Sequence, residues 1–404
     1  TYTTVGEIVA WVIGWDLILE MLMAGSVVSK YWGVYLNQFF ELIGWNINTN
    51  IAIGSFNFDL APVIIVAFFT ALLVMGTKIG ARVDGALTIL KIAIVVFIVV
   101  VGFFYIKAEN FTPFIPPSEP AASTDGSGVS AVMEQPLWQW ATGMAPSIYG
   151  VTGIISGAAL VFFAFLGFDV VATASEETIN PKKNVPLGIG VGLGLIIVLY
   201  TLVAIVTTGM VSYKDLAKQS DPSLAVAFKM VGADWAAKII SLGIVIGMAT
   251  VVMVLLLGLT RVVFAMSRDG LLPRGLSHTG KHGTPVRLQI IVGVVMALIA
   301  ACCNVGILSD MVNIGTLSAF TLVAISIPIM RKKRPDLERS FKIPGNPWVP
   351  ILIAIANLWL MVNLSVLTWI RFVVWLIVGF AIYFGYGYRH ARLGAGELEV
   401  AAQE

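Results

Sequence analysis

Charged side chains are scarce in this sequence of 404 residues. Only 12% of the residues are Asp, Glu, Lys or Arg, whereas 58% are apolar and the mean hydropathy is +0.91. A soluble domain carries about 25% charged residues, so this composition excludes a surface that faces water on all sides. Many apolar runs reach the roughly 20 residues that cross a hydrocarbon core about 30 Å thick. The sequence therefore predicts an all-α polytopic membrane protein, with the lipid bilayer as its main partner.

Cysteine and histidine are also rare, with two and three copies. Cys302 and Cys303 are adjacent within an apolar stretch, which favours small core residues and indicates no disulfide. His278 and His282 lie in a glycine-containing loop without carboxylate or cysteine neighbours, so we expect no metal site and no cofactor. A polytopic membrane enzyme would gather such side chains at one membrane face and is the weaker alternative. We expect neither enzymatic activity nor a nucleic-acid partner.

Ten apolar runs predict ten spans within a single transmembrane domain. They lie at 5–29, 61–77, 86–106, 152–174, 187–210, 235–260, 286–304, 310–330, 348–369 and 371–388. Successive loops on alternate sides place sixteen of the 25 Lys and Arg residues on one side and seven on the other. Cytoplasmic loops carry the excess of Lys and Arg, so both ends of this chain are predicted to be cytoplasmic, including a tail at 389–404.

Two outer loops and one span carry further signals. Loop 30–60 is predicted to contain a short amphipathic helix, and segment 117–148 is typical of a flexible insert. The fifth span carries Gly188, Gly190, Gly192 and Gly194. These form two interleaved pairs of small residues four apart, a pattern that predicts close packing against a neighbouring helix.

Four ionisable residues inside spans, Asp16, Glu20, Lys91 and Asp169, are the informative exceptions, because each costs roughly 2.5–3.5 kcal/mol at the centre of a bilayer. Asp16 and Glu20 are four residues apart and share one helical face, where both cannot stay ionised cheaply. They line a polar cavity or conduct protons, or they form an interior polar pair bonded to neighbouring helices. Lys91 lies a few residues into the third span. It either couples protons through a lowered pKa or extends its ammonium group to the interface.

The fourth span contains a glycine and a carboxylate, in the stretch FFAFLGFD that ends at Asp169. Gly167 weakens the helix there. Unwound backbone at membrane depth is tolerated only where it is buried in protein or lines a cavity. We therefore predict a helix break near Leu166 and Gly167. The alternative is a continuous helix in which Asp169 bonds to a neighbour.

The residues around this break resemble a known family. VFFAFLGFDVVATASEETINPKKNVPLGI resembles the sixth helix and following loop of amino acid permeases in the amino acid–polyamine–organocation superfamily, in particular the bacterial relatives of cationic amino acid transporters. VGEIVAWVIGWDLILE, LTRVVFAMSRDGLLP and NIGTLSAFTLVAISIPIMRKKRPD agree with it. The resemblance covers nearly the whole chain outside 117–148.

The resemblance implies an inverted five-plus-five helix repeat of the LeuT type with two extra helices, twelve in all. Residues 1–106 would then hold the last three helices of the first repeat, 152–330 the second repeat and 348–388 the extra pair. The family's first two helices are expected to be absent from this chain. A non-transporting fragment is therefore one alternative, because the broken first helix supplies half of the family's substrate site.

The resemblance also implies a function and a set of site residues. It predicts proton-coupled amino acid uptake by alternating access in the plasma membrane, with amino acid and protons as partners. Lys91 matches the family's fifth-helix lysine and is expected to couple protons. The apolar pocket half favours neutral substrates unless Asp169 points inward. The expected substrate-binding residues are Phe163, Ala164, Phe165, Leu166, Gly167, Asp169, Glu20, Met21, Thr250, Met253 and Val254.

Overall fold

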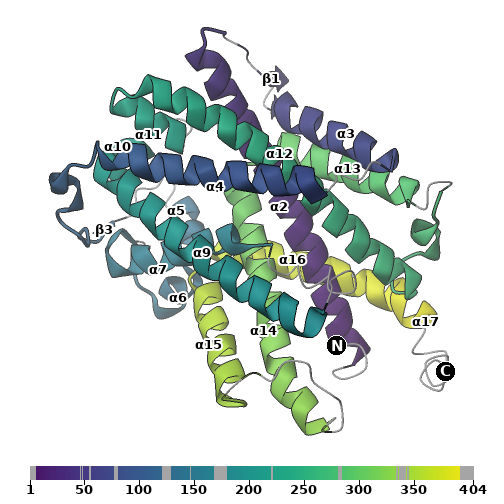
Figure 1. The fold of residues 1–404 in the computed structure, drawn as a ribbon. Helices are drawn as coiled ribbons and strands as arrows, with labels where there is room; N and C mark the ends of the chain where they lie inside the picture. The colour runs from purple at the N-terminus through teal and green to yellow at the C-terminus, as the bar shows by residue number, and fades with distance from the viewer. Residues whose placement is uncertain are drawn as a thin grey trace.

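The structure is a computed structural model that describes most of the chain as helix (Figure 1). The described residues are 6–45, 47, 49–53, 56–76, 81–120, 129–145, 147–167, 180–219, 222–280, 284–333, 335, 343 and 345–391. The α-helices are α2 (Glu7–Leu42), α3 (Leu60–Val74), α4 (Ala81–Phe103), α5 (Val129–Glu134), α6 (Leu137–Thr142), α7 (Gly150–Val161), α9 (Pro181–Met210), α10 (Tyr213–Ala217), α11 (Leu224–Met230), α12 (Asp234–Arg268), α13 (Val286–Cys302), α14 (Val305–Lys333), α15 (Trp348–Val362), α16 (Val366–Ile382) and α17 (Tyr388–His390).

Short segments complete the described structure. The 3-10 turns are η1 (Ala108–Phe111), η2 (Phe162–Phe165) and η4 (Arg274–Ser277), and a π-helical turn at Tyr383–Gly387 follows α16. Two small antiparallel sheets pair β1 (Asn50–Ile53) with β2 (Phe56–Asp59) and β3 (Glu119–Pro120) with β4 (Ser147–Ile148).

The helices account for all ten predicted spans. Within the described residues, six helices are long and apolar enough to cross a membrane: α2, α4, α9, α12, α14 and the α16–α17 segment. Four shorter apolar helices, α3, α7 with η2, α13 and α15, correspond to the other four predicted spans. The prediction of an all-α polytopic membrane protein is confirmed.

Two predicted boundaries are wrong. The first span does not stop near residue 29, because α2 continues to Leu42 and includes the residues predicted as a separate amphipathic helix. The turn between the last two spans lies at 363–365 and not at 370. Ser365 is the N-cap of α16, because its hydroxyl accepts a hydrogen bond from the Thr368 amide at 3.2 Å. Such a cap satisfies an amide that has no partner within the helix. Arg371, the first residue of the predicted last span, therefore lies inside α16 and not at its start.

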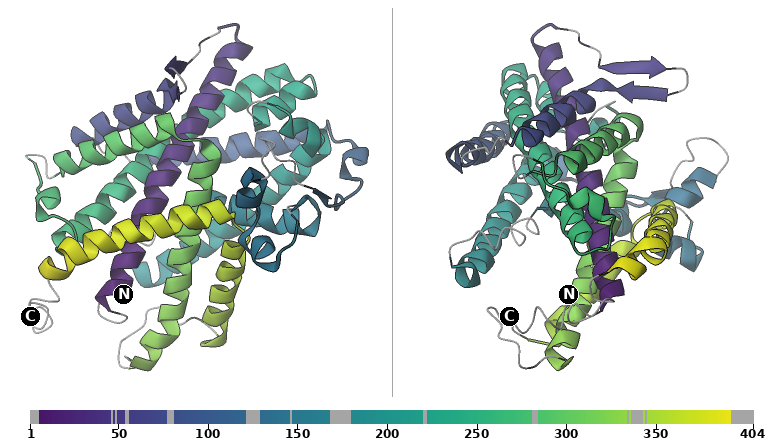
Figure 2. Two further views of the ribbon diagram at one scale, coloured as in Figure 1. Left: turned by 180° about the vertical axis from the view of Figure 1, so that it is seen from behind. Right: turned by 90° about the vertical axis from the view of Figure 1, so that its right-hand side faces the viewer.

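α2 is the central helix of the molecule, and its most extensive contacts are with α12 and α14 (Figure 2). Its first half also packs against α16 through aromatic side chains. The rings of Trp15 and Trp375 stack 4.4 Å apart, and the Trp15 indole N–H donates to the Trp375 carbonyl at 3.0 Å. The Tyr383 hydroxyl donates to Glu7 Oε1 at 2.9 Å, which places the start of α2 beside the end of α16.

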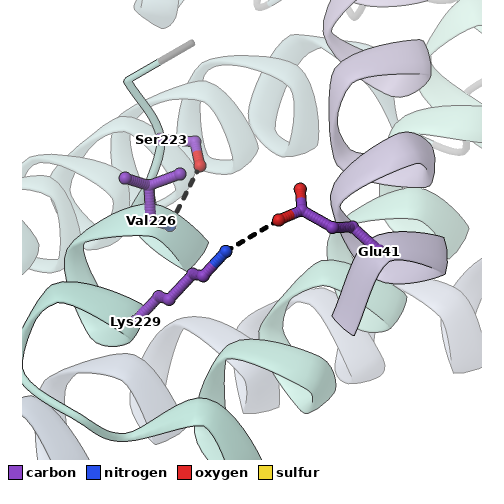
Figure 3. Close-up of polar contacts among 4 residues, drawn as sticks. All are labelled: Glu41, Ser223, Val226 and Lys229. Atoms are coloured by element: carbon purple, nitrogen blue, oxygen red, sulfur yellow. Dashed lines mark hydrogen bonds and ion pairs between the residues drawn. The ribbon is translucent and has the colours of Figure 1, made fainter. Parts of the chain in front are cut away.

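At the other end of α2, an ion pair connects it to α11. Lys229 Nζ lies 2.8 Å from Glu41 Oε1, and Ser223 caps α11 by accepting a hydrogen bond from the Val226 amide at 3.2 Å (Figure 3). Both charged side chains are about half exposed, at 50% and 58%. An exposed pair of this kind contributes about 0–1 kcal/mol, so this contact orients α11 more than it stabilises it.

The glycines that permit close helix packing are not the four glycines predicted for the fifth span. No described atom lies within 4 Å of a β-carbon built on Gly188, Gly190, Gly192 or Gly194, so the close packing predicted for α9 is wrong for the described part of the chain. Small residues permit close packing only where a second helix faces them. Gly293 of α13 is such a case, because a β-carbon there would collide with the Thr70 side chain of α3.

We therefore expect Gly293→Leu to force α3 and α13 apart and to destabilise the protein by about 1–3 kcal/mol, the usual cost of overpacking. Thermal unfolding of the purified protein in detergent should show a lower Tm. Gly306→Leu on α14 is the matched control, since no described atom lies within 4 Å of its built β-carbon. Equal Tm values for the two variants would contradict the packing argument.

Candidate functional site

The predicted break in the fourth span is present. The α-helix α7 ends at Val161, the 3-10 turn η2 follows, and Leu166 is extended with φ −61° and ψ 144°. Gly167 then has φ +120°, a conformation that side chains other than glycine rarely adopt. The helix break near Leu166 and Gly167 is confirmed.

Asn313 of α14 supplies partners for the backbone on both sides of the transition from α7 to η2. Its Oδ1 accepts a hydrogen bond from the Phe163 amide at 2.7 Å, and its Nδ2 donates to the Leu160 carbonyl at 2.6 Å. The side chain is fully buried. Backbone groups that lose their helical partners within a bilayer need such partners from the protein. Sequence analysis missed Asn313, although an asparagine inside an apolar helix was the available signal.

Tyr200 of α9 holds the next residue of the turn. Its hydroxyl donates to the Ala164 carbonyl at 2.9 Å, and its ring lies 5.4 Å from the Phe165 ring. Within the turn itself, the Leu166 amide donates to the Phe163 carbonyl at 3.0 Å. The carbonyls of Phe163 and Ala164 therefore already accept hydrogen bonds in this conformation. Each carbonyl oxygen has a second lone pair that can accept from a ligand.

The side chains of the break enter an apolar cluster between three helices. Phe163 and Leu166 pack against buried residues of α2, α12 and α14, which are Ala24, Val27, Leu255, Leu308 and Val312. The cluster closes one side of the unwound segment with hydrocarbon. A ligand at the exposed carbonyls would thus meet an apolar wall and a few polar backbone groups, as small-molecule sites usually do.

The predicted residues of α2, Glu20 and Met21, are buried in the core of the bundle, as is Asp16. Asp16 and Glu20 are both fully buried, and Asp16 lies close to Ser318 of α14. Met21 instead faces α12, since its sulfur stands 3.0 Å from a β-carbon built on Gly258. Met23, on a different face of α2 from Met21, packs in both the cluster that contains Phe162 and the cluster that contains Phe163.

Lys91 lies between α4 and α12. Its aliphatic stem covers Gly247, whose built β-carbon would stand 3.2 Å from Lys91 Cγ. The Thr250 hydroxyl donates to the Gly247 carbonyl at 2.9 Å, so this predicted residue lies one turn from the lysine stem. The lysine is half-buried, and a larger residue at 247 would displace it. Thr250 therefore lies near Lys91. Both residues lie in a different part of the bundle from the contact between Asn313 and the helix break.

The remaining predicted residues are placed as follows. Met253 is partly buried and packs against the main core cluster, whereas Val254 is exposed on the surface of α12. Asp169 lies outside the described residues. Among the described residues, no group of three or more His, Cys, Asp or Glu side chains is arranged to hold a metal ion.

Comparison with known proteins identifies the family. Residues 1–385 match the amino acid permease family, so the chain belongs to it and is a multi-pass membrane protein of the amino acid–polyamine–organocation superfamily. The chain is 40% identical over 403 residues to the branched-chain amino acid permease BcaP of Bacillus subtilis, covering 97% of this chain and 79% of that protein. The methylthioribose transporter of the same organism is 39% identical over 401 residues, with the same coverage.

A plant relative is more distant. Cationic amino acid transporter 3, mitochondrial, of Arabidopsis thaliana is 34% identical over 345 residues, which is 84% of this chain and 52% of that protein. The resemblance to relatives of cationic amino acid transporters is thus confirmed.

The Asn313 contacts can be tested by removing them. Asn313→Leu leaves the Phe163 amide and the Leu160 carbonyl unpaired, and an unpaired buried group costs about 1–3 kcal/mol. We expect a clear fall in Tm in detergent. Thr316→Val, on the same helix, is the control, because among the described residues the Thr316 hydroxyl bonds to Val312 of its own helix, at 2.9 Å, and to no other group. A Tm for Asn313→Leu no lower than that of Thr316→Val would show that Asn313 is dispensable.

Proposed function

We propose that this protein is a secondary transporter that takes up amino acids by alternating access, coupled to protons. The observation that carries the proposal is the broken helix at Phe162–Gly167, held inside a bundle of apolar helices. Unwound backbone near the middle of a membrane is tolerated where it lines a cavity, and transporters use it to bind substrate and ions. Membership of the amino acid permease family supports the same activity.

The substrate would bind at the unwound segment. The carbonyls of Phe163, Ala164 and Phe165 would accept hydrogen bonds from its ammonium group, while Leu166 and the aromatic rings cover its side chain. We also assign Gly167, Glu20, Met21, Met253 and Asp169 to this site, as the family resemblance implies. The apolar wall of Ala24, Val27 and Leu255 supports a neutral aliphatic substrate, and so does the name of the 40% identical relative, a branched-chain amino acid permease.

Lys91 is the proposed proton carrier. Its stem packs on Gly247 between two spans, which keeps the ammonium group partly away from bulk water. The family resemblance, in which Lys91 matches the fifth-helix lysine, supports the same role. Asp16 and Glu20, fully buried on α2, are further candidates for the proton path.

We also propose that both ends of the chain face the cytoplasm of a cell with this protein in its plasma membrane. The charge bias of the loops supports this orientation. The hydrogen bond between Glu7 and Tyr383, which places the start of α2 beside the end of α16, is consistent with two ends on one side. The proposed division remains three helices of a first repeat in 1–106, a second repeat in 152–330 and an extra pair in 348–388.

A second candidate substrate comes from the relative named a methylthioribose transporter, which is 39% identical. A thioether sugar also fits an apolar wall, but it has no ammonium group for the carbonyls of the break. Competition separates the two substrates. We expect excess L-leucine, L-isoleucine and L-valine to block uptake of radiolabelled L-leucine into proteoliposomes of the full-length protein, while excess methylthioribose leaves it unchanged. Uptake of radiolabelled methylthioribose without any uptake of radiolabelled L-leucine would reverse the assignment.

Proton coupling is tested at Lys91. In proteoliposomes with an inward proton gradient, we expect Lys91→Ala to abolish accumulation of leucine, because the variant cannot carry the proton. Exchange of internal for external leucine, which needs no net proton movement, should persist and shows that the variant is folded. Lys238→Ala, an exposed lysine of α12, is the control and should accumulate leucine normally. Accumulation by Lys91→Ala at the normal level would exclude the proposed role.

A further inference from the structure

The helix α14 ends in three consecutive basic residues, Arg331, Lys332 and Lys333. Both lysines are exposed, and within the described part of the chain neither has an ion-pair partner. Neighbouring positive charges without an acidic partner attract a negative charge from outside the protein. The helix dipole and the preference of cytoplasmic loops for cations also favour basic residues here, but neither accounts for the face of α15 beside them.

Two hydrogen bonds bring this basic turn to the start of α15. Arg331 Nη2 donates to the Ile343 carbonyl at 3.1 Å, and two residues later the Gly345 carbonyl accepts from the Val349 amide at 3.0 Å. Trp348 is the first residue of α15. The two helices pack against each other, and the end of α14 and the start of α15 lie at the same end of the molecule (Figure 1). The basic turn is therefore close to the first turn of α15.

One face of α15 is apolar and exposed along most of the helix. Trp348 is 72% exposed, and Leu352, Ile355 and Trp359 are 63%, 57% and 50% exposed. Residues that follow each other at intervals of four, three and four lie on the same side of a helix. We call these four residues the exposed face of α15. In a membrane protein such a face is in contact with lipid chains.

The length of this face matches one lipid chain. The eleven residues from Trp348 to Trp359 rise by about 1.5 Å each, so the face is about 16 Å long. One leaflet contributes about 15 Å to a hydrocarbon core that is about 30 Å thick. Tryptophan is enriched where the hydrocarbon meets the lipid headgroups. Trp348 therefore marks the headgroup level at the end of the face where the basic residues lie.

From this arrangement we propose that the basic turn of α14 and the exposed face of α15 bind one anionic phospholipid. Lys332 and Lys333 attract its phosphate group, Trp348 lies at the headgroup, and one acyl chain lies along the exposed face. A zwitterionic lipid also brings a positive group toward the lysines, so a headgroup with net negative charge is favoured. The proposed orientation assigns the site to the cytoplasmic leaflet. Binding itself depends neither on that orientation nor on the proposed transport activity.

Native mass spectrometry of the full-length protein in a non-ionic detergent tests this site. With phosphatidylglycerol and phosphatidylcholine of identical acyl chains, we expect one phosphatidylglycerol to bind more tightly. In the double variant Lys332→Gln, Lys333→Gln, the Kd for phosphatidylglycerol should rise about 25-fold, because each lysine near an anionic lipid surface contributes about fivefold. The Kd for phosphatidylcholine should change little. Raised salt should weaken phosphatidylglycerol binding to the unaltered protein, because salt screens exposed charges.

Two further variants separate the charges from the exposed face. Lys107→Gln, Lys238→Gln is the matched control, because it removes two exposed lysines that are predicted on the other side of the membrane. It should keep the preference for phosphatidylglycerol. Trp348→Ala removes no charge and should weaken the binding of both lipids while the preference remains. All the altered side chains are exposed, so the Tm values should equal that of the unaltered protein.

Two results would overturn the proposal. Equal affinity of the unaltered protein for the two lipids would show that the basic turn of α14 sets membrane orientation alone. An undiminished preference for phosphatidylglycerol in the Lys332, Lys333 double variant would place the anionic lipid at another surface.

Discussion

Every backbone amide and carbonyl inside a bilayer needs a partner from the protein, and the helix break at Phe162–Gly167 is the place where this requirement is hardest to meet. The fold meets it with two side chains from other helices. Asn313 pairs with the Phe163 amide and the Leu160 carbonyl, and Tyr200 pairs with the Ala164 carbonyl. These bonds connect the broken helix to α14 and to α9.

Much of the fold could be predicted because the length of each apolar run decides where a helix crosses the membrane. A helix that crosses hydrocarbon must be apolar for about 20 residues, so span positions follow directly from the sequence. Span ends depend on local capping instead. Nothing in the sequence distinguishes Ser365 from other serines. Its role as the cap of α16 depends on the hydrogen bond from the Thr368 amide, which only the structure shows. For the same reason, nothing in the apolar run marks Leu42 as the end of α2.

The candidate site was only partly predictable. Gly167 marked the break because glycine alone adopts its backbone conformation readily, and the family resemblance pointed to the same residues. Asn313 and Tyr200 are uncharged at neutral pH, so the cost of placing a charge in the bilayer did not single them out. Whether a helical residue such as Met21 faces α12 or the break depends on helix rotation, which the weak amphipathicity of a mostly apolar helix does not determine. The glycines of α9 show the same difficulty, because a row of small residues does not reveal which face has a neighbour.

The two hydrogen bonds of Asn313 also have a mechanical consequence. Leu160 and Phe163 are attached to the same side chain, and that side chain belongs to the 29-residue helix α14. Any displacement of α14 relative to α7 would therefore have to stretch or break both bonds at once. One side chain thus couples α14 to the α-helix and to the 3-10 turn that follows it.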